Sequence, residues 1–483
     1  MSKAKRALVV LLGTWTLGAA AAWAGEPDVS DLARTVEALK ARLRDQKRRI
    51  AELEEHQSEQ SKREDIRNLV DEALGEIGPS DFRVYWDHGM RARTGDGRLK
   101  MKFGGRLMFD WTWIDGGDIE NDFAGSGFAD LDNLEDGKET RRAYLYWEGE
   151  WNEKIRFRWQ YDWADGPVVK DLYLELKKLP VVGNLRMGHF KEPFSLTQLT
   201  PDKYITFIER ASADMFTPKR NAGFMLHNHM LNKRVTWAAG LFQDTADDPA
   251  NDQYDDAQAI RDGDETFTMR ITGLPLYAND GKQLIHAGFG YSYRSLEHNL
   301  RYRQRPETHI LPRFVNTGQI GMVDDENLFG AELAAVFGPF HIESEYMHSD
   351  IQMSRDVNQS DPGFSGWYVQ VGYFLTGEHR PYKTSSGAFT RVKPKKNWDE
   401  DGPGAWEIAG RYSQLDLDDA GIEGGVMENY TLGLNWYLNP NVRMMWNYIH
   451  CEVEYIGGLG APVAFQNIND DTDIIIMRLQ VDF

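Results

Sequence analysis

The C-terminal stretch Asp470–Phe483, DDTDIIIMRLQVDF, decides the fold class of this 483-residue chain. Strict alternation of apolar and polar residues from Met477 to Phe483 indicates a β-strand with one apolar and one polar side. Terminal residues usually fray unless the fold ties them down, so we expect this strand to be an integral part of the architecture. Its apolar positions, taken in steps of two from the end, are Phe483, Val481, Leu479, Met477 and Ile475.

The same alternation continues upstream. In LKMKFGGRLMFDWTW (99–113) and KIRFRWQYDW (154–163), aromatic and aliphatic residues alternate with Lys, Arg, Gln and Asp. Clusters of Asp, Gly, Asn and Pro separate such segments from one another. We predict sixteen strands in this way, at 99–113, 141–151, 153–163, 169–177, 184–191, 222–230, 233–243, 264–274, 283–294, 327–338, 339–349, 365–377, 403–416, 427–439, 440–455 and 472–483.

An even number of alternating strands of about ten residues, with aromatics towards their ends, is typical of an antiparallel transmembrane β-barrel. Short turns such as Asn152, LNK and NPN are expected on one side of the barrel. Long acidic loops are expected on the other, at 115–139, 244–263, 295–326 and 378–402. A soluble β-sandwich or propeller is the alternative, but it does not explain why one face is aromatic and the other densely charged. The last strand must then pair with the first, because an open sheet edge in lipid leaves backbone groups without hydrogen bonds.

The composition excludes several other classes of protein. A formal charge of −20 disfavours nucleic acid as a partner. After residue 24, no apolar run reaches the roughly 18 residues that a spanning helix needs. The single cysteine, Cys451, cannot form an internal disulfide, and no nucleophile motif with an ordered histidine is present, so no enzyme activity and no catalytic residue are expected. His227 and His229 are spaced as two zinc ligands can be, but no third ligand is evident, and we expect neither a metal nor a cofactor.

The N-terminal region divides into two segments. Basic residues, an apolar run and Ala22-Trp23-Ala24 predict a secretory signal peptide over residues 1–24. Residues 25–78 are rich in Glu, Arg, Lys and Leu, and apolar residues recur at spacings of 4 and 3, which predicts a periplasmic helical coiled coil. A solvated single helix acting as a spacer is the alternative. Residues 79–483 are expected to form the barrel.

A barrel of this size encloses water, so the inward residues determine which solutes pass. Across the first strands the polar face is modestly basic, although the whole chain is acidic. The connection at 191–220 differs from the other loops because it mixes apolar residues with Lys191, Lys203, Arg210, Lys219 and Arg220. We expect it to fold into the barrel, where the wall covers its apolar residues, and to present its basic residues to ions.

Several ordered motifs resemble the phosphate-selective porin O and P family of Gram-negative outer membranes, over about residues 99–483. They include KFGGRL, RRAYLYWEG, GHFKEPFSLTQLTPDKYITFIER, YFLTGEHRPYK, LGLNWYLNPNVRM and MRLQVDF. The resemblance implies a trimeric, anion-preferring channel in the cell outer membrane, with lipid around it and small inorganic anions as partners. Where phosphate-selective members carry a lysine in the constricting loop, this chain has Gln198, so the resemblance does not extend to phosphate specificity.

The inward-facing pattern and the resemblance together give eleven candidate pore-lining or anion-binding residues. For each wall arginine, solute contact competes with a structural role in ion pairs that brace the wall. Neighbouring strand residues point to opposite faces, so Arg141 and Arg142 cannot both face the lumen unless the strand is irregular there. The candidates are Lys102, Arg106, Arg141, Arg142, Tyr144, Arg156, Arg158, Asp171, Lys203, Arg210 and Arg220.

The sequence favours an outer-membrane porin that conducts phosphate or similar small anions. The alternative is a structural role in which the barrel anchors a periplasmic coiled coil that tethers the envelope, with non-specific conductance. The terminal Phe483 is similar to the aromatic end signal of outer-membrane barrels, and Arg478 becomes a further candidate for the pore lining.

Overall fold

The computed structural model describes residues 81–87, 89–115, 134–164, 166–243, 266–296, 300–355, 359–455 and 468–483. The chain divides into two compact units, Met1–Gly78 and Pro79–Phe483. The signal peptide expected at 1–24 and the coiled coil expected at 25–78 lie outside the described residues. No helix in the described ranges is long and apolar enough to cross a membrane.

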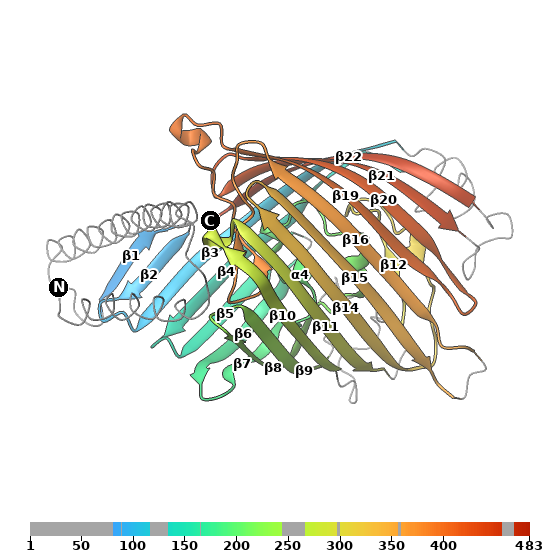
Figure 1. The fold of residues 1–483 in the computed structure, drawn as a ribbon, viewed down its shortest axis with the longest axis horizontal. Helices are drawn as coiled ribbons and strands as arrows, with labels where there is room; N and C mark the ends of the chain where they lie inside the picture. The colour runs from blue at the N-terminus through green and yellow to red at the C-terminus, as the bar shows by residue number, and fades with distance from the viewer. Residues whose placement is uncertain are drawn as a thin grey trace, which may run out of the picture. The chain divides into compact units, whose positions relative to one another are not determined.

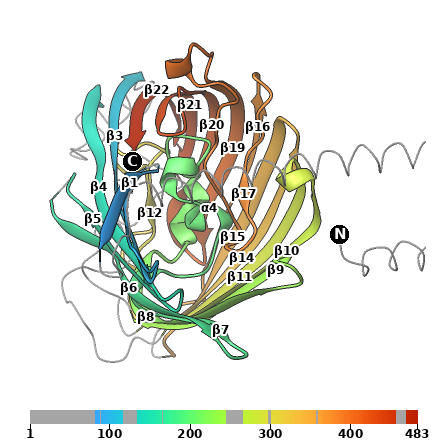
Figure 2. The ribbon, with the colours of Figure 1, turned by 90° about the vertical axis from the view of Figure 1, so that its left-hand side faces the viewer.

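Sixteen strands of the 18-stranded main sheet form a closed antiparallel barrel, which confirms the predicted architecture (Figures 1 and 2). Each strand pairs with the next along the barrel, and the last strand pairs with the first, with Arg478 opposite Asp110. The strands are β3 (Leu99–Asp115), β4 (Gly137–Trp151), β5 (Ile155–Asp162), β6 (Val168–Leu179), β7 (Gly183–Lys191), β8 (Arg220–Met230), β9 (Val235–Gln243), β10 (Thr266–Ala278), β11 (Gln283–Ser295), β14 (Val323–Phe337), β15 (Phe340–Met353), β16 (Gly363–Phe374), β19 (Ala405–Asp419), β20 (Ile422–Tyr437), β21 (Val442–Tyr455) and β22 (Ile468–Asp482).

The period-2 pattern places apolar residues outside and polar residues inside. In β22, Ile475 and Leu479 are exposed on the outer surface, whereas Arg478 and Gln480 are buried against the contents of the lumen. Trp147 and Trp159 lie opposite each other on the outer face of β4 and β5. An apolar outer band with aromatic side chains is the surface that a barrel presents to lipid.

The seam between β22 and β3 is closed by the last residue of the chain. The Phe483 N–H donates to the Gly105 carbonyl at 3.1 Å, and the Gly105 N–H donates to the Phe483 carbonyl at 3.0 Å. A Cβ atom on Gly105 would lie 2.5 Å from the Phe483 ring, so only glycine leaves room for that ring. Further along the same seam, Arg478 and Asp110 form two hydrogen bonds of 2.7 and 2.6 Å.

Two short strands of the main sheet were not predicted, namely β1 (Phe82–Trp86) and β2 (Met90–Thr94). They form a hairpin, and β2 pairs with Lys100–Phe103 of β3 along the edge that β22 leaves free after Phe483. Figure 1 shows this hairpin continuing the sheet beyond the end of the barrel. Five alternating residues in each strand are a weak signal, which is why the hairpin escaped the sequence analysis.

The placement of residues 378–402 among the loops of the long-loop end was wrong. Successive strands alternate in direction, and the segment 375–404 follows the twelfth barrel strand, β16, so it joins the short turns at the other end. At the long-loop end, the connection from β19 to β20 is instead the tight turn at Ala420 and Gly421. Length was a poor guide here because the segment has structure of its own, β17 (Tyr382–Lys383), β18 (Ala388–Phe389) and η4 (Trp398–Glu400).

Three segments fill part of the lumen, as the view along the barrel shows (Figure 2). The inner loop, residues 192–219, contains α4 (Leu196–Leu199), η1 (Asp202–Tyr204) and η2 (Ser212–Phe216). The upper loop, residues 300–322, contains β12 (Arg303–Gln304) and β13 (Val315–Asn316). The lower turn, residues 375–404, enters from the short-turn end, where Phe389 N–H donates to the Thr200 hydroxyl of the inner loop at 3.3 Å.

The inward side of the wall differs between the two halves of the barrel. On β14 and β15 and on β19 to β22, many inward residues are apolar and form one buried cluster with the inner and upper loops. Cys451 belongs to this cluster and is fully buried. The inward side of β3 to β8 is charged instead. The water-filled route is therefore expected beside β3 to β8, because the apolar half of the lumen is packed with protein.

A Gly104→Ala substitution is expected to destabilise the seam. The added Cβ would meet the Tyr146 hydroxyl and the Phe483 carbonyl oxygen, and the latter is fixed by the ladder. Overpacking of this kind costs roughly 1–3 kcal/mol. The temperature at which the folded barrel loses its compact electrophoretic mobility should fall, whereas Gly410→Ala, where a Cβ meets nothing within 4 Å, should leave it unchanged. Equal temperatures for both variants would contradict this account of the seam.

Candidate functional site

The inner loop is attached to the wall through a carboxylate of β15. Glu345 accepts hydrogen bonds from the Ser195 hydroxyl at 2.8 Å and from the backbone N–H groups of Leu196 and Thr197, both at 2.9 Å. The Tyr368 hydroxyl donates to the same carboxylate at 2.7 Å. These bonds satisfy the free N–H groups at the start of α4, and the short helix is thereby held inside the barrel.

Wall arginines hold the next part of the inner loop by its backbone carbonyls. Arg443 donates to the carbonyls of Ile205 and Thr206 at 2.7 and 2.9 Å. Arg411 donates to the carbonyl of Glu209 at 3.0 Å. These buried guanidinium groups therefore hold the loop in place by hydrogen bonds to its backbone. They are not exposed to solutes in the channel.

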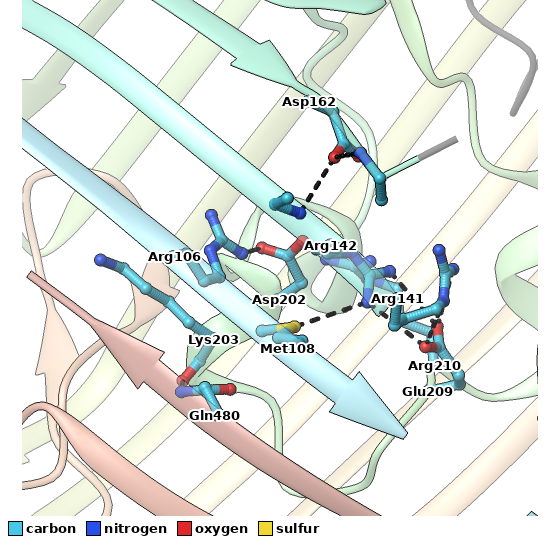
Figure 3. Close-up of polar contacts among 12 residues, drawn as sticks. Arg106, Met108, Arg141, Arg142, Asp162, Asp202, Lys203, Glu209, Arg210 and Gln480 are labelled. Atoms are coloured by element: carbon cyan, nitrogen blue, oxygen red, sulfur yellow. Dashed lines mark hydrogen bonds and ion pairs between the residues drawn. The ribbon is translucent and has the colours of Figure 1, made fainter. Parts of the chain in front are cut away.

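Two carboxylates of the inner loop point into an arginine cluster on the wall (Figure 3). Asp202 contacts Arg106 of β3 and lies 2.9 Å from Nε of Arg142 of β4. Glu209 pairs with Arg141 at 2.9 Å and with Arg142 at 3.3 Å. It also binds the seam residue Arg478 at 2.7 Å. The cluster thus joins the loop, two wall strands and the seam.

Both loop carboxylates stay ionised. Burial opposes the ionisation of Asp202, but the positive charges of Arg106 and Arg142 hold its pKa well below the usual range. Burial likewise disfavours the charged form of Glu209, and Arg141, Arg142 and Arg478 outweigh it and keep its pKa well below the usual range. The arginine cluster is consequently neutralised in part and keeps a surplus of positive charge.

Arg141 and Arg142 contact the same carboxylate because β4 is irregular at this point. Met108 pairs with Arg142 and Phe109 pairs with Thr140, so Arg141 is the extra residue of a β-bulge. A bulge breaks the alternation of faces and lets two consecutive side chains point to one side. The structure therefore has the local strand irregularity that the sequence analysis required if Arg141 and Arg142 were to face the same side.

A cavity of about 340 Å³ lies between β4 to β8, the inner loop and the upper loop. Ten Lys and Arg residues line it against five Asp and Glu residues. Arg305 of the upper loop has a half-buried guanidinium, and burial together with the nearby charge of Arg141 lowers its pKa. The lining of this cavity therefore has a surplus of positive charge, although the net charge of the whole chain is −20.

The side chain of Lys191, at the end of β7, reaches the inner loop at Gln198. Its ammonium donates to the backbone carbonyl of Gln198 at 2.6 Å, and both residues line the cavity. Arg210 comes from the opposite part of the loop and is held by the carbonyls of Thr197 and Thr200 at 2.9 and 3.0 Å. The sequence signal for Lys191 was its place in the basic segment 191–220, but no pattern indicated that it would reach Gln198.

A second basic group lies towards the short-turn end of the lumen. The Lys203 ammonium pairs with Asp482 at 2.8 Å, and Arg391 of the lower turn pairs with the same carboxylate. Lys102 and Lys203 lie 5.3 and 5.8 Å from the centre of the Tyr146 ring. Aromatic rings attract cations in this geometry and help to hold like charges close together.

The structure brings most of the eleven candidates into ion pairs that line the charged half of the barrel. Arg156 and Arg158 pair with Glu148 at 3.0 and 3.1 Å. Asp171 bridges Arg158 at 3.0 Å and Arg220 at 2.8 Å. Tyr144 stacks under Arg106, with the guanidinium 4.5 Å from the ring centre. The sequence analysis did not single out Asp202, Glu209, Arg305 and Arg391, and it named Lys191 only among the basic residues of the segment 191–220.

A closed sixteen-stranded barrel with chain segments folded into a charged lumen defines the porin class of outer-membrane channels. The chain belongs to the phosphate-selective porin O and P family, whose sequence pattern matches residues 114–483. It is therefore a channel protein of the outer membrane. The fold and the family both agree with the resemblance seen in the sequence.

Two relatives and one solved structure illustrate what the chain is similar to. Porin O of Pseudomonas aeruginosa is 24% identical over 446 residues, which are 84% of this chain and 93% of that protein. An uncharacterized protein of Caulobacter vibrioides is 30% identical over 379 residues, which are 76% of this chain and 71% of that protein. Among solved structures, the anion-selective porin from Comamonas acidovorans has a TM-score of 0.51 at 11% identity, over 80% of this chain and all (100%) of that chain.

A Glu209→Gln substitution is expected to raise anion selectivity. It removes one negative charge from the arginine cluster and leaves three guanidinium groups with less compensation. The anion-to-cation permeability ratio, measured as a reversal potential in a planar bilayer, should rise about two-fold at low salt. Glu153→Gln, on an exposed turn, is the control and should change nothing. An unchanged ratio in a folded Glu209→Gln barrel would show that this cluster does not face the conducted ions.

Anion conductance is expected to fall between pH 7 and pH 9. Burial lowers the pKa of Lys203 to about 8, so its ammonium is protonated at pH 7 and loses its charge as the pH rises through that value. The lumen then loses one cation near the short-turn end. Conductance in dilute KCl should be titrated against pH, and Lys203→Arg should remove the transition because a guanidinium stays charged throughout. A transition of equal size in Lys203→Arg would assign it to another group.

Proposed function

We propose that the protein is a passive channel through which small inorganic anions, phosphate among them, cross the outer membrane. The observation that carries the proposal is the cavity lined by ten basic and five acidic side chains. Membership of the family and the similarity to the anion-selective porin of Comamonas acidovorans support a preference for anions over cations. No covalent chemistry is required of any residue.

The proposed mechanism is replacement of hydration followed by release. In the cavity, the Lys191 ammonium and the guanidinium groups of Arg210, Arg220 and Arg305 would supply donors in place of the water around an entering anion. Neighbouring carboxylates such as Asp171 and Asp202 keep each site weak. Conduction needs binding that is strong enough for entry and weak enough for exit, which partial neutralisation provides.

Phosphate is the preferred anion in this proposal because of the position of Lys191. Its ammonium lies beside the loop carbonyl of Gln198, where it adds a compact charge with several donors. Phosphate carries more charge and more acceptor oxygens than chloride, so a site with both ammonium and guanidinium donors favours it. Lys191 would thus supply the lysine contact to phosphate that the loop residue Gln198 cannot supply.

We also propose a homotrimer in which the segment 25–78 lies in the periplasm as a coiled coil. The heptad-like spacing of Leu32, Val36, Leu39 and Leu43 supports helices that associate with one another. The barrel itself would then face lipid over the remaining part of its outer apolar surface.

Bilayer recordings test the proposed function. The purified channel should show an anion-selective reversal potential in a KCl gradient, and added phosphate should reduce the chloride current by competing for the cavity. Lys191→Met should weaken that competition about ten-fold, which corresponds to the loss of one charge-assisted hydrogen bond to the anion. Lys178→Met, which removes a lysine from an exposed turn, is the control. Cation selectivity of the unmodified channel would overturn the proposal, and equal competition in both variants would remove Lys191 from it.

A further inference from the structure

The lower turn has an outer part to which the proposed channel function gives no role. This part is residues 393–404, which we call the rim segment, and it includes η4. It packs on the turn between β20 and β21, where the Trp398 N–H donates to the Leu438 carbonyl at 2.7 Å and Asn439 donates to Asp399 at 3.2 Å. Figures 1 and 2 show η4, in orange, beyond the ends of the barrel strands. The rim segment therefore lies at the short-turn end of the wall.

Trp398 of the rim segment completes a group of three tryptophans. Trp406 of β19 lies opposite Trp436 of β20, and their stacked rings have centroids 5.1 Å apart. The Trp398 ring meets the Trp436 ring edge-on, with centroids 6.2 Å apart. Both wall tryptophans also donate from Nε1 to the Pro403 carbonyl, at 3.2 and 3.0 Å. These contacts fix the rim segment to the wall through its backbone and through one ring.

The two wall tryptophans belong to the outer, lipid-facing surface. Their neighbours along the strands, Glu407 and Asn435, are buried on the lumen side, where Asn435 binds the inner loop. Alternation therefore places Trp406 and Trp436 outside. Indole rings at the edge of the apolar surface of a barrel lie at the level of the lipid headgroups. Trp398 is 55% exposed beside them, so the rim segment adds a further ring to this level from outside the wall.

Charged residues flank Trp398 on both sides in the sequence. The ammonium groups of Lys395 and Lys396 donate to the carbonyls of Thr376 and Asp401, at 3.1 and 3.2 Å, and each ammonium has three N–H donors in all. The number of exposed cations equals the number of exposed carboxylates, so the segment matches a ligand that carries both charges. The cations are Lys393, Lys395 and Lys396, and the carboxylates are Asp399, Glu400 and Asp401.

We propose that the rim segment binds a phospholipid whose headgroup carries both a phosphodiester and a primary ammonium, in the membrane leaflet at the short-turn end. The lysines donate to the phosphodiester, and the carboxylates accept from the ammonium. Trp398 covers the boundary between headgroup and acyl chains, where indole rings are favoured. A periplasmic protein is the competing occupant, but the continuity of Trp398 with the lipid-facing Trp406 and Trp436 favours lipid.

A bound lipid would hold the lower turn from outside the barrel. The same turn reaches into the lumen, where the Phe389 N–H donates to the Thr200 hydroxyl and Arg391 pairs with Asp482. The lower turn therefore connects a lipid-facing segment with the contents of the lumen. The lipid site does not depend on which ions the channel conducts.

The depth of a nitroxide label tests the position of the rim segment. Cys451 is the only cysteine of the chain and is fully buried, so in the folded Trp398→Cys variant only residue 398 takes the label. In vesicles of phosphatidylethanolamine and phosphatidylglycerol, oxygen should reach this label more readily than a water-soluble nickel complex does. The control is Val181→Cys, 96% exposed on a turn at the same end, whose label should favour the nickel complex. Equal access of nickel to both labels would overturn the proposal, and a protein occupant predicts that result.

Lipid retention tests the headgroup. Native mass spectrometry counts the phosphatidylethanolamine that stays on the barrel in mild detergent. The count should fall about five-fold in Lys393→Gln with Lys395→Gln. It should not change in Lys233→Gln with Lys282→Gln, which removes two exposed lysines from other turns at the same end.

Two variants of the tryptophan separate lipid binding from folding. Trp398→Ala should lower the phosphatidylethanolamine count, whereas Trp398→Tyr should keep it, because tyrosine also has an aromatic ring with a polar tip. Each variant should keep the compact electrophoretic mobility of the folded barrel. Folded lysine and alanine variants that retain as much phosphatidylethanolamine as the unmodified barrel would overturn the proposal.

Discussion

Closure of the sheet between β22 and β3 is the constraint on which the rest of the structure depends. In lipid, an unpaired strand edge would leave a row of N–H and C=O groups without partners, so the barrel exists only when its last strand meets its first. This seam also positions part of the candidate site. Arg478 binds Asp110 across the seam and Glu209 of the inner loop at 2.7 Å, so the interaction that closes the wall also positions the loop beside the channel.

The second governing interaction is compensation of charge between the loop and the wall. A bare arginine cluster in a partly dehydrated lumen would bind anions too tightly for conduction, and a fully paired one would not bind them at all. Asp202 and Glu209 between them meet Arg106, Arg141, Arg142 and Arg478, which leaves more guanidinium groups than carboxylates. The ion pairs show the bracing role that the sequence analysis offered as one alternative, and contact of the same network with solutes belongs to the proposed function.

All sixteen barrel strands could be predicted because alternation is a local property that each strand carries in its own residues. The hairpin of β1 and β2 was missed since five-residue strands carry little of that signal. The geometry of the site was harder to predict, because it depends on contacts between distant parts of the chain. Glu345 binds Leu196 across 149 residues, and the bulge at Arg141 and the approach of Lys191 to Gln198 are likewise products of packing. The charged residue types of the site and the unusual inner loop could be identified in the sequence, but the residues that they contact could not.

The division of the lumen follows from the same physical argument. A barrel of sixteen strands is wide, and a wide lumen lined evenly with charge would discriminate poorly between ions. Here the apolar cluster on β14, β15 and β19 to β22 packs the inner and upper loops against one half of the wall. The proposed route for ions would then lie in the other half, where the charges of β3 to β8 are close to the loop. The buried apolar half thus narrows the route, and narrowness makes a modest surplus of cations sufficient for selectivity, because fields are focused between low-dielectric walls.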